Sequence, residues 1–162
     1  MDIAVIGTGF IGGILGRALA GAGHHVTFGS RHPDDDQVAD NTQATVAAIA
    51  EALTRAEVVI LALPGAAVAE LTAAHADALA RKLVIDATNQ MGQPVANSRA
   101  ALPSNVRYAR AFNTLGGENM ADPVFADGPA DLFFSAPEAD RATVETVITG
   151  VGLHPIYLGD DQ

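Results

Sequence analysis

The sequence contains no cysteine, and few of its residues are charged. Without thiols the chain forms no disulfide, and neither thiolate catalysis nor a thiolate metal site is available to it. Charged residues make up 17% of the 162 residues, whereas 49% are hydrophobic. This balance is typical of a folded α/β protein and argues against disorder.

Long apolar runs and basic residues are scarce as well. Proline, glycine and polar residues interrupt each apolar stretch before it reaches the roughly 20 residues of a membrane-spanning helix. The start, Met1-Asp2, lacks the basic segment of a secretory signal peptide. We therefore expect a cytoplasmic protein without a membrane partner. The net charge of −10 argues against nucleic acid as a partner, because a phosphate backbone requires a basic surface.

The strongest positive signal is the run Gly7-Thr8-Gly9-Phe10-Ile11-Gly12. The apolar residues 2–6 before it predict a buried strand, residues 11–19 after it carry apolar side chains at helical spacing, and residues 25–29 predict a second strand. A Gly-x-Gly-x-x-Gly between a strand and a helix is the dinucleotide-binding fingerprint. We predict that Gly7 allows the turn, Gly9 lets a pyrophosphate approach the backbone, and Gly12 lets the helix pack on the strand.

The end of the second strand indicates which dinucleotide binds. NAD sites place an acidic residue roughly 20 residues past the glycines, to bind the ribose 2′-OH. Here the strand ends in Gly29-Ser30-Arg31-His32, and the first carboxylate is Asp34. A hydroxyl and a guanidinium suit a 2′-phosphate, which favours NADP(H) over NAD(H). His32 either contacts the adenosine or is an exposed loop residue. The acidic run 34–36 predicts a solvated loop rather than a metal site.

Strands and helices alternate along the rest of the chain. Further strands are predicted at 57–63, 82–88, 105–112, 132–135 and 154–158, with a short one at 37–39; helices at 42–53 (capped by Thr42), 66–81, 95–102 and 137–148; and a loop at 113–119. The alternation predicts one α/β domain over residues 1–162, with a doubly wound, mostly parallel sheet of the Rossmann type. Ligands of such sheets bind at the carboxyl ends of the strands. That rule brings residues 8–12, 30–32, 63–65, 87–91 and 113–117 to one rim.

Five segments, in this order, resemble the NADPH-dependent reductases of coenzyme F420, a deazaflavin. They are Gly7–Gly12, Gly29–Arg31, Leu63-Pro64, Asp86-Ala87-Thr88-Asn89 and Ala111–Gly116. Members of this family pass hydride between NADP(H) and coenzyme F420, and the resemblance covers nearly the whole chain. One departure is that the chain ends at Gln162, where family members usually continue with helices that close the substrate pocket, so we expect that extension to be absent.

The resemblance also implies roles for individual residues. Thr8, Ser30 and Arg31 would bind the 2′-phosphate, and Gly9–Ile11 the pyrophosphate. Leu63, Pro64, Ala87 and Asn89 would line the nicotinamide, and Asn113, Thr114, Leu115 and Gly116 would face the second cofactor or the substrate. For Asn89 and Asn113 the alternative is a turn residue that bonds its own backbone.

Hydride transfer needs no protein acid or base, because the cofactors carry the chemistry. The sequence accordingly predicts no catalytic dyad and no metal, and we expect the Asp86 carboxylate to accept backbone N–H groups. The first hypothesis is an NADP(H)-dependent oxidoreductase acting on a deazaflavin or another small acceptor. The second is a non-catalytic NADP(H)-binding or sensing module. The third is an imine or ketone reductase of the β-hydroxyacid dehydrogenase type, which ranks last because those enzymes have a long helical substrate domain. The sequence leaves open whether the chain forms a homodimer.

Overall fold

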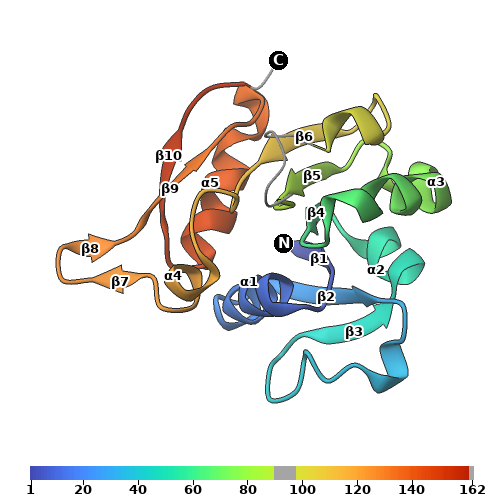
Figure 1. Cartoon of the computed structure of the whole chain (residues 1–162), viewed down its shortest axis with the longest axis horizontal. Coiled ribbons are helices and arrows are strands. Elements are labelled where there is room, and N and C mark those ends of the chain that lie inside the picture. Colours follow the sequence, from blue (N-terminus) through green and yellow to red (C-terminus); the bar gives the residue numbers. More distant parts are fainter. Residues whose placement is uncertain (90–97, 161–162) are drawn as a thin grey trace.

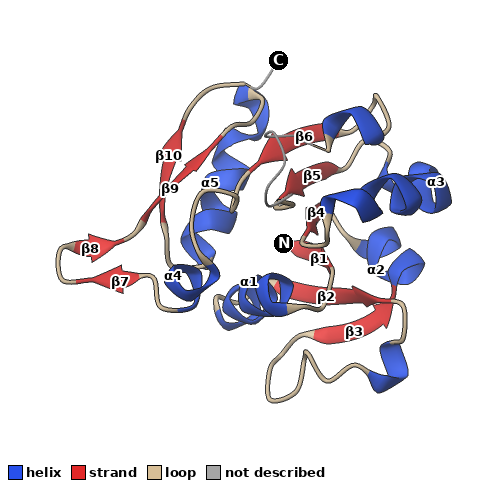
Figure 2. Ribbon diagram, viewed as in Figure 1, coloured by secondary structure: helices blue, strands red, loops and turns tan. Residues whose placement is uncertain are grey.

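A six-stranded parallel sheet forms the centre of the molecule, with the strand order β3-β2-β1-β4-β5-β6 (Figures 1 and 2). The computed structural model describes residues 1–89 and 98–160. The strands are β1 (Asp2–Ile6), β2 (His25–Ser30), β3 (Thr45–Ala48), β4 (Val58–Leu61), β5 (Leu83–Asp86) and β6 (Arg107–Arg110). The order reverses between β1 and β4, where doubly wound sheets bind their ligands. The predicted fold class is confirmed.

Alternate residues of the central strands belong to two separate hydrophobic layers. Ile3 and Val5 of β1 pack in the cluster that contains the buried side chains of α1 (Phe10–Gly21). Ala4 and Ile6 pack with those of the two helices on the other face, α2 (Ile49–Arg55) and α3 (Val68–Leu79). Successive side chains of a strand point to opposite faces, so a sheet covered on both sides needs apolar residues throughout.

The C-terminal part of the chain builds a second, two-stranded parallel sheet. Its strands are β9 (Asp131–Phe134) and β10 (His154–Tyr157), which α5 (Arg141–Gly150) connects (Figure 1). Two backbone hydrogen bonds between Arg110 and Ser135 attach this sheet to the end of β6. Its buried side chains belong to the same cluster as those of α1. The sequence predicts both strands but not their separation from the main sheet.

Short elements complete the fold. They are the 3₁₀ turns η1 (Pro33–Asp35), η2 (Gly65–Ala67), η3 (Arg99–Ala101) and η4 (Glu138–Asp140), the helix α4 (Gly117–Ala121), and the hairpin of β7 (Val124–Phe125) and β8 (Gly128–Pro129). No helix in the described ranges is long and apolar enough to cross a membrane. Of the helix predicted at 95–102, residues 95–97 lie outside the described residues, and the rest contains only the 3₁₀ turn η3.

The prediction for residues 37–53 is wrong in its details. Residues 37–39 form no strand; the strand is β3, and α2 begins only at Ile49. Thr42 caps no helix, because its hydroxyl donates to the Ala39 carbonyl at 2.6 Å and accepts from the Ala44 N–H at 3.1 Å. Thr45 instead pairs with Thr27 at the edge of β2. Strand pairing overrides the helical spacing of this segment.

The predicted loop at 113–119 is also too long, because α4 begins at Gly117. A Cβ on Gly117 would lie 2.4 Å from Cε1 of Phe10 and 2.9 Å from Cδ1 of Ile11. The start of α4 therefore packs closely against the first turn of α1. This contact holds the loop before α4 beside the glycine motif.

Candidate functional site

A cavity of about 850 Å³ lies at the carboxyl ends of β1, β2 and β4. Its walls are the loop 7–9 after β1, residues 29–32 at the end of β2, residues 62–64 after β4, part of the segment 35–37, and one side of α3. This volume falls within the range of ligand pockets, roughly 300–1,000 Å³. Three of the five rim segments predicted from the sequence thus meet around one cavity.

Each glycine of the motif has a distinct environment. Gly7 has a φ of +111°, and a Cβ there would lie 2.3 Å from the Ala62 carbonyl oxygen. At Gly12 a Cβ would lie 1.9 Å from the Gly7 carbonyl oxygen, so both positions require glycine to form the loop at all. A Cβ on Gly9 would meet no atom within 4 Å. Gly9 is thus dispensable for packing, and its Cα borders open space that a ligand can approach.

The first turn of α1 follows directly from this loop. Gly9 is its N-cap, and the Gly9 carbonyl accepts the Gly13 N–H at 2.8 Å. The N–H groups at the start of a helix have no intrahelical acceptor and carry the positive end of the helix dipole, which suits a pyrophosphate. The side chains of Phe10 and Ile11 are not among the described residues that line the cavity. Phe10 is 69% exposed.

Ser30, Arg31 and His32 all line the cavity, as predicted for the adenosine end. Ser30 is buried, whereas Arg31 and His32 are exposed. The Ser30 hydroxyl donates to Oδ2 of Asp36 at 2.9 Å and accepts the His32 N–H at 3.2 Å. The Val38 N–H donates to Oδ1 of Asp36 at 3.1 Å.

Asp36 is one residue of this site that the sequence did not reveal. It belongs to the acidic run predicted to be a solvated loop, yet it is half-buried and lines the cavity. Burial raises the pKa of its carboxyl, but hydrogen bonding with Thr8, Ser30 and Val38 outweighs burial and lowers that pKa below its ordinary value. Asp36 lies 24 positions after Gly12, a separation at which nucleotide folds often place an acidic residue, and this was the available signal.

Of the residues predicted to line the nicotinamide, only some belong to the cavity wall. Leu63 and Pro64 line the cavity, together with Glu70 and His75 of α3, which the sequence did not assign to the site. Ala87, Asn89 and residues 113–116 are not among the described residues of the wall. The predicted rim position Met91 falls outside the described residues.

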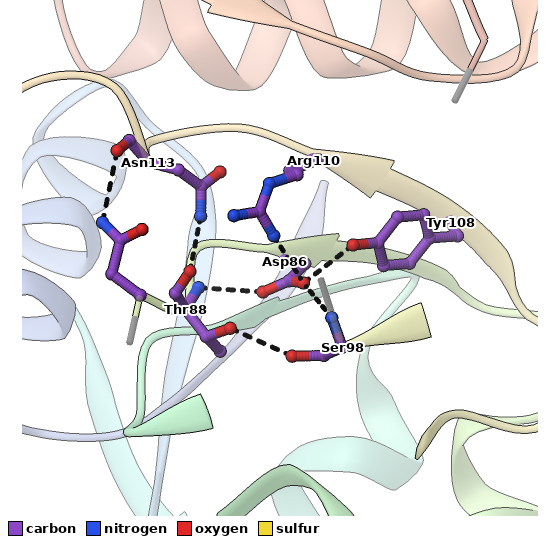
Figure 3. A network of polar contacts seen from close by, with 7 residues as sticks. Asp86, Thr88, Ser98, Tyr108, Arg110 and Asn113 are labelled. Atoms are coloured by element: carbon purple, nitrogen blue, oxygen red, sulfur yellow. Dashed lines mark hydrogen bonds and ion pairs between the residues drawn. The ribbon is translucent and has the colours of Figure 1, made fainter. Parts of the chain in front are cut away.

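Asp86, at the end of β5, is the centre of a polar network that includes Thr88, Ser98 and two residues of β6 (Figure 3). Its carboxylate is completely buried and accepts the N–H groups of Thr88 and Ser98, each at 2.8 Å. The Tyr108 hydroxyl donates to it at 2.7 Å, and the Arg110 guanidinium lies 3.2 Å away. Burial raises the pKa of Asp86, but these hydrogen bonds lower it below its ordinary value. The expectation that this carboxylate accepts backbone N–H groups is confirmed.

Two asparagines join the loops that follow β5 and β6. The side chain of Asn113 donates to the Thr88 carbonyl at 2.7 Å, and that of Asn89 donates to the Asn113 carbonyl at 3.2 Å (Figure 3). Both side chains thus bond the backbone of the other loop rather than their own. Phe112, buried just before Asn113, has a φ of +67°, a strained conformation for an aromatic residue. These bonds brace residues 88 and 89 against Asn113.

No group of three or more His, Asp or Glu side chains that could hold a metal ion occurs within residues 1–89 and 98–160. The arrangement is instead that of a nucleotide site at the switch point of a parallel sheet. It combines a turn of glycines, one helix N-terminus, and a hydroxyl and a guanidinium at the end of β2.

Comparison with known proteins agrees with this geometry. Residues 2–90 match the family model described as NADP oxidoreductase, coenzyme F420-dependent. The chain is 30% identical to the solved structure of a candidate F420-dependent NADP reductase from Arthrobacter sp. FB24, with a TM-score of 0.80 over 99% of this chain and 85% of that one. A hypothetical protein from Sinorhizobium meliloti is 27% identical, with a TM-score of 0.83 and the same coverage.

More distant structures share the fold alone. An imine reductase from Aspergillus terreus, solved in complex with NADPH4, is 23% identical, with a TM-score of 0.77. The alignment covers 99% of this chain but only 55% of that enzyme. No curated protein matches the sequence.

Proposed function

Because the chain belongs to the family of F420-dependent NADP oxidoreductases, we propose that it transfers hydride between NADP(H) and a deazaflavin such as coenzyme F420, or another small acceptor. NADP-dependent oxidoreductase is the class that family membership gives; the acceptor is our proposal. The observation that carries it is the cavity at the switch point, where Gly9 leaves open space for a ligand beside the start of α1.

We assign the residues around the cavity to the parts of the cofactor. The N–H groups at the start of α1 hold the pyrophosphate. Ser30 and Arg31 hold the 2′-phosphate, since a guanidinium can bond two phosphate oxygens at once. Leu63 and Pro64 form an apolar wall for the nicotinamide, which supplies the hydride when the cofactor is bound.

The braced loops after β5 and β6 border the acceptor in this proposal. Asn89 and Asn113 are used to join the loops, so their role is to position the backbone around the acceptor. Asp86 is buried and accepts four donors, and it exchanges no proton in the reaction. The protein contributes orientation and exclusion of water, which hydride transfer between two rings requires.

The first test is a paired titration of the purified chain with NADPH and NADH, followed by nicotinamide fluorescence. We expect NADPH to bind at least ~10-fold more tightly, about 1.4 kcal/mol. Arg31→Ala should remove that difference. Arg55→Ala is the matched control, because it removes the same charge from an exposed residue that pairs with Glu51 and does not line the cavity. Equal binding of both nucleotides by the natural chain would contradict the assignment.

Turnover then distinguishes the enzyme from a non-catalytic NADP(H)-binding or sensing module. One observation favours that alternative: the residues expected to face the substrate are not among the described residues lining the cavity. Oxidation of NADPH is measured with F420, flavins and quinones as acceptors. Turnover with F420 well above that with flavins supports the proposal. Tight NADPH binding without oxidation by any acceptor supports the sensing module.

A further inference from the structure

Asp36 occupies an unexpected position in a site that receives a phosphate. Its carboxylate accepts the Ser30 hydroxyl at 2.9 Å and the Val38 N–H at 3.1 Å. Ser30 is the hydroxyl residue that the proposed function assigns to the 2′-phosphate. A carboxylate and a phosphate oxygen are both anionic acceptors, so they compete for the same donors.

The geometry of the loop alone does not explain this arrangement. The bond from Val38 to Asp36 spans two residues and is the common turn-forming bond of an aspartate. The bond from Ser30 spans six residues and joins the loop to the buried end of β2. The adjacent Asp35 also lines the cavity, but its side chain makes no hydrogen bond that we find in the described part of the chain.

Resting on the proposed function, we propose that Asp36 determines cofactor preference by competing, as an internal anion, with the 2′-phosphate of NADP(H) for the hydroxyl of Ser30. NADP(H) must displace the carboxylate to use this donor and then binds close to its negative charge. NADH carries no 2′-phosphate and meets no such competition. Asp36 therefore weakens NADPH binding selectively and narrows the preference that Arg31 creates.

The low pKa of Asp36 agrees with this role. Hydrogen bonding outweighs burial and keeps the carboxyl ionised at neutral pH, so the competitor is an anion when a nucleotide arrives. Arg31 is exposed and lines the same cavity. The two residues thus act in opposite directions on one phosphate.

Asp36→Asn tests the proposal, because asparagine removes the charge and still offers an oxygen to the Val38 N–H. Dissociation constants for NADPH and NADH are measured for the natural chain and the variant. We expect NADPH to bind at least ~10-fold more tightly, about 1.4 kcal/mol, and NADH to change less than ~3-fold. Asp36→Ala should give the same selective gain in NADPH affinity. This second variant is needed because the asparagine side-chain oxygen could still accept the Ser30 hydroxyl and so keep it from the phosphate.

Asp34→Asn is the matched control. It removes the same charge from an exposed residue of the same loop that does not line the cavity, so it reports the general electrostatic effect of one carboxylate fewer. We expect it to change both affinities by less than ~3-fold, since exposed charges are screened. An equal gain in NADPH affinity in Asp36→Asn and in the control variant would overturn the proposal. The proposal would also fail if the ratio of the NADPH and NADH affinities changed only because NADH bound more weakly, because Asp36 would then accept a hydrogen bond from the ribose 2′-hydroxyl.

A pair of fragments separates this proposal from the proposed function. Adenosine 2′,5′-bisphosphate and adenosine 5′-monophosphate differ only by the 2′-phosphate, and neither contains nicotinamide. A gain for the 2′-phosphorylated fragment alone in Asp36→Asn upholds the competition even if no acceptor is ever reduced. If NADPH binds the natural chain and neither Asp36 variant changes its affinity, the competition is wrong and the proposed function stands. If neither NADPH nor the fragment binds any variant, both proposals fail.

Discussion

Asp86 illustrates how one residue can be both buried and charged. Its carboxylate is completely inaccessible, and the transfer of an unpaired charge from water to such a place would be prohibitive. Two backbone N–H groups, the Tyr108 hydroxyl and the Arg110 guanidinium satisfy it, so the ionised form is the stable one. The same bonds hold Thr88 and Ser98 in place. The residue is structural, and its effect on function is indirect.

At the residue scale we predict that Asp86→Asn lowers the free energy of unfolding by at least about 3 kcal/mol, because it leaves Arg110 without its buried partner. The folded pKa of Asp86 lies below the ordinary value of 3.8, so its contribution is fully present above that value and is lost as pH falls through the folded pKa. Acid unfolding curves should therefore depend less on pH in the variant.

The control for this prediction is Asp131→Asn. Asp131 bonds His154 at 2.7 Å, but its side chain is 59% exposed, so its removal should leave the unfolding midpoint nearly unchanged. Urea unfolding at neutral and acidic pH measures both variants. Equal losses for Asp86→Asn and Asp131→Asn would show that burial gives Asp86 no special importance.

At the scale of elements, the β1–loop–α1 unit separates stability from ligand binding. The loop can form only because Gly7 adopts a positive φ and Gly12 has no side chain to collide with the Gly7 carbonyl. Gly9, two residues from Gly7, faces no such restriction. The three glycines of the motif are therefore required for different physical reasons: Gly7 and Gly12 allow the loop to form, and Gly9 leaves space for the ligand.

We predict opposite outcomes for alanine at two of these glycines. Gly12→Ala should lower the melting temperature by several degrees, because its Cβ would overlap a backbone oxygen that cannot rotate away. Gly9→Ala should melt within about a degree of the natural chain and lose NADPH affinity at least ~10-fold, since its methyl group enters the space left for the ligand. Thermal melts and nucleotide titrations check both. Unchanged NADPH binding by Gly9→Ala would remove the pyrophosphate from this loop.

At the scale of the whole molecule, one hydrophobic cluster joins the two sheets. Val144, Val147 and Ile148 of α5 are fully buried in the cluster that also holds residues of α1 and of the central strands. The small sheet therefore cannot unfold without exposing the core of the large one. The two sheets share one folding unit, although within the described residues their strands are connected by a short bridge of backbone bonds between Arg110 and Ser135.

This shared core predicts cooperative unfolding. Ile148→Ala should lower the free energy of unfolding by about 2–5 kcal/mol, the usual cost of a cavity left by a large aliphatic side chain. The far-UV and near-UV circular dichroism signals should still change in a single common transition. Exposed Ala142→Gly, on the same helix, is the comparison and should cost only about 1 kcal/mol. Separate transitions in Ile148→Ala would mean that the C-terminal sheet folds independently.

The sequence by itself determined the elements whose cause is local or periodic. The glycine motif and the continuous apolar runs at 3–6, 58–61 and 83–85 predict a nucleotide-binding parallel sheet, because turn geometry and burial on both faces restrict those positions directly. Ser30, Arg31, Leu63 and Pro64, which the sequence assigns to cofactor binding, line the cavity. Their positions follow from the rule that strands of a parallel sheet end at one rim.

Only the tertiary structure decided features that depend on contacts between distant segments. Residues 45–48 have helical spacing and form a strand because the edge of β2 offers unpaired backbone groups. Asp36 resembles a solvated loop residue until the fold brings it to Ser30, and Asn113 resembles a turn residue until the Thr88 carbonyl lies beside it. Local patterns fix local conformation, whereas a polar side chain takes its partner from whatever the assembled fold places within hydrogen-bonding distance.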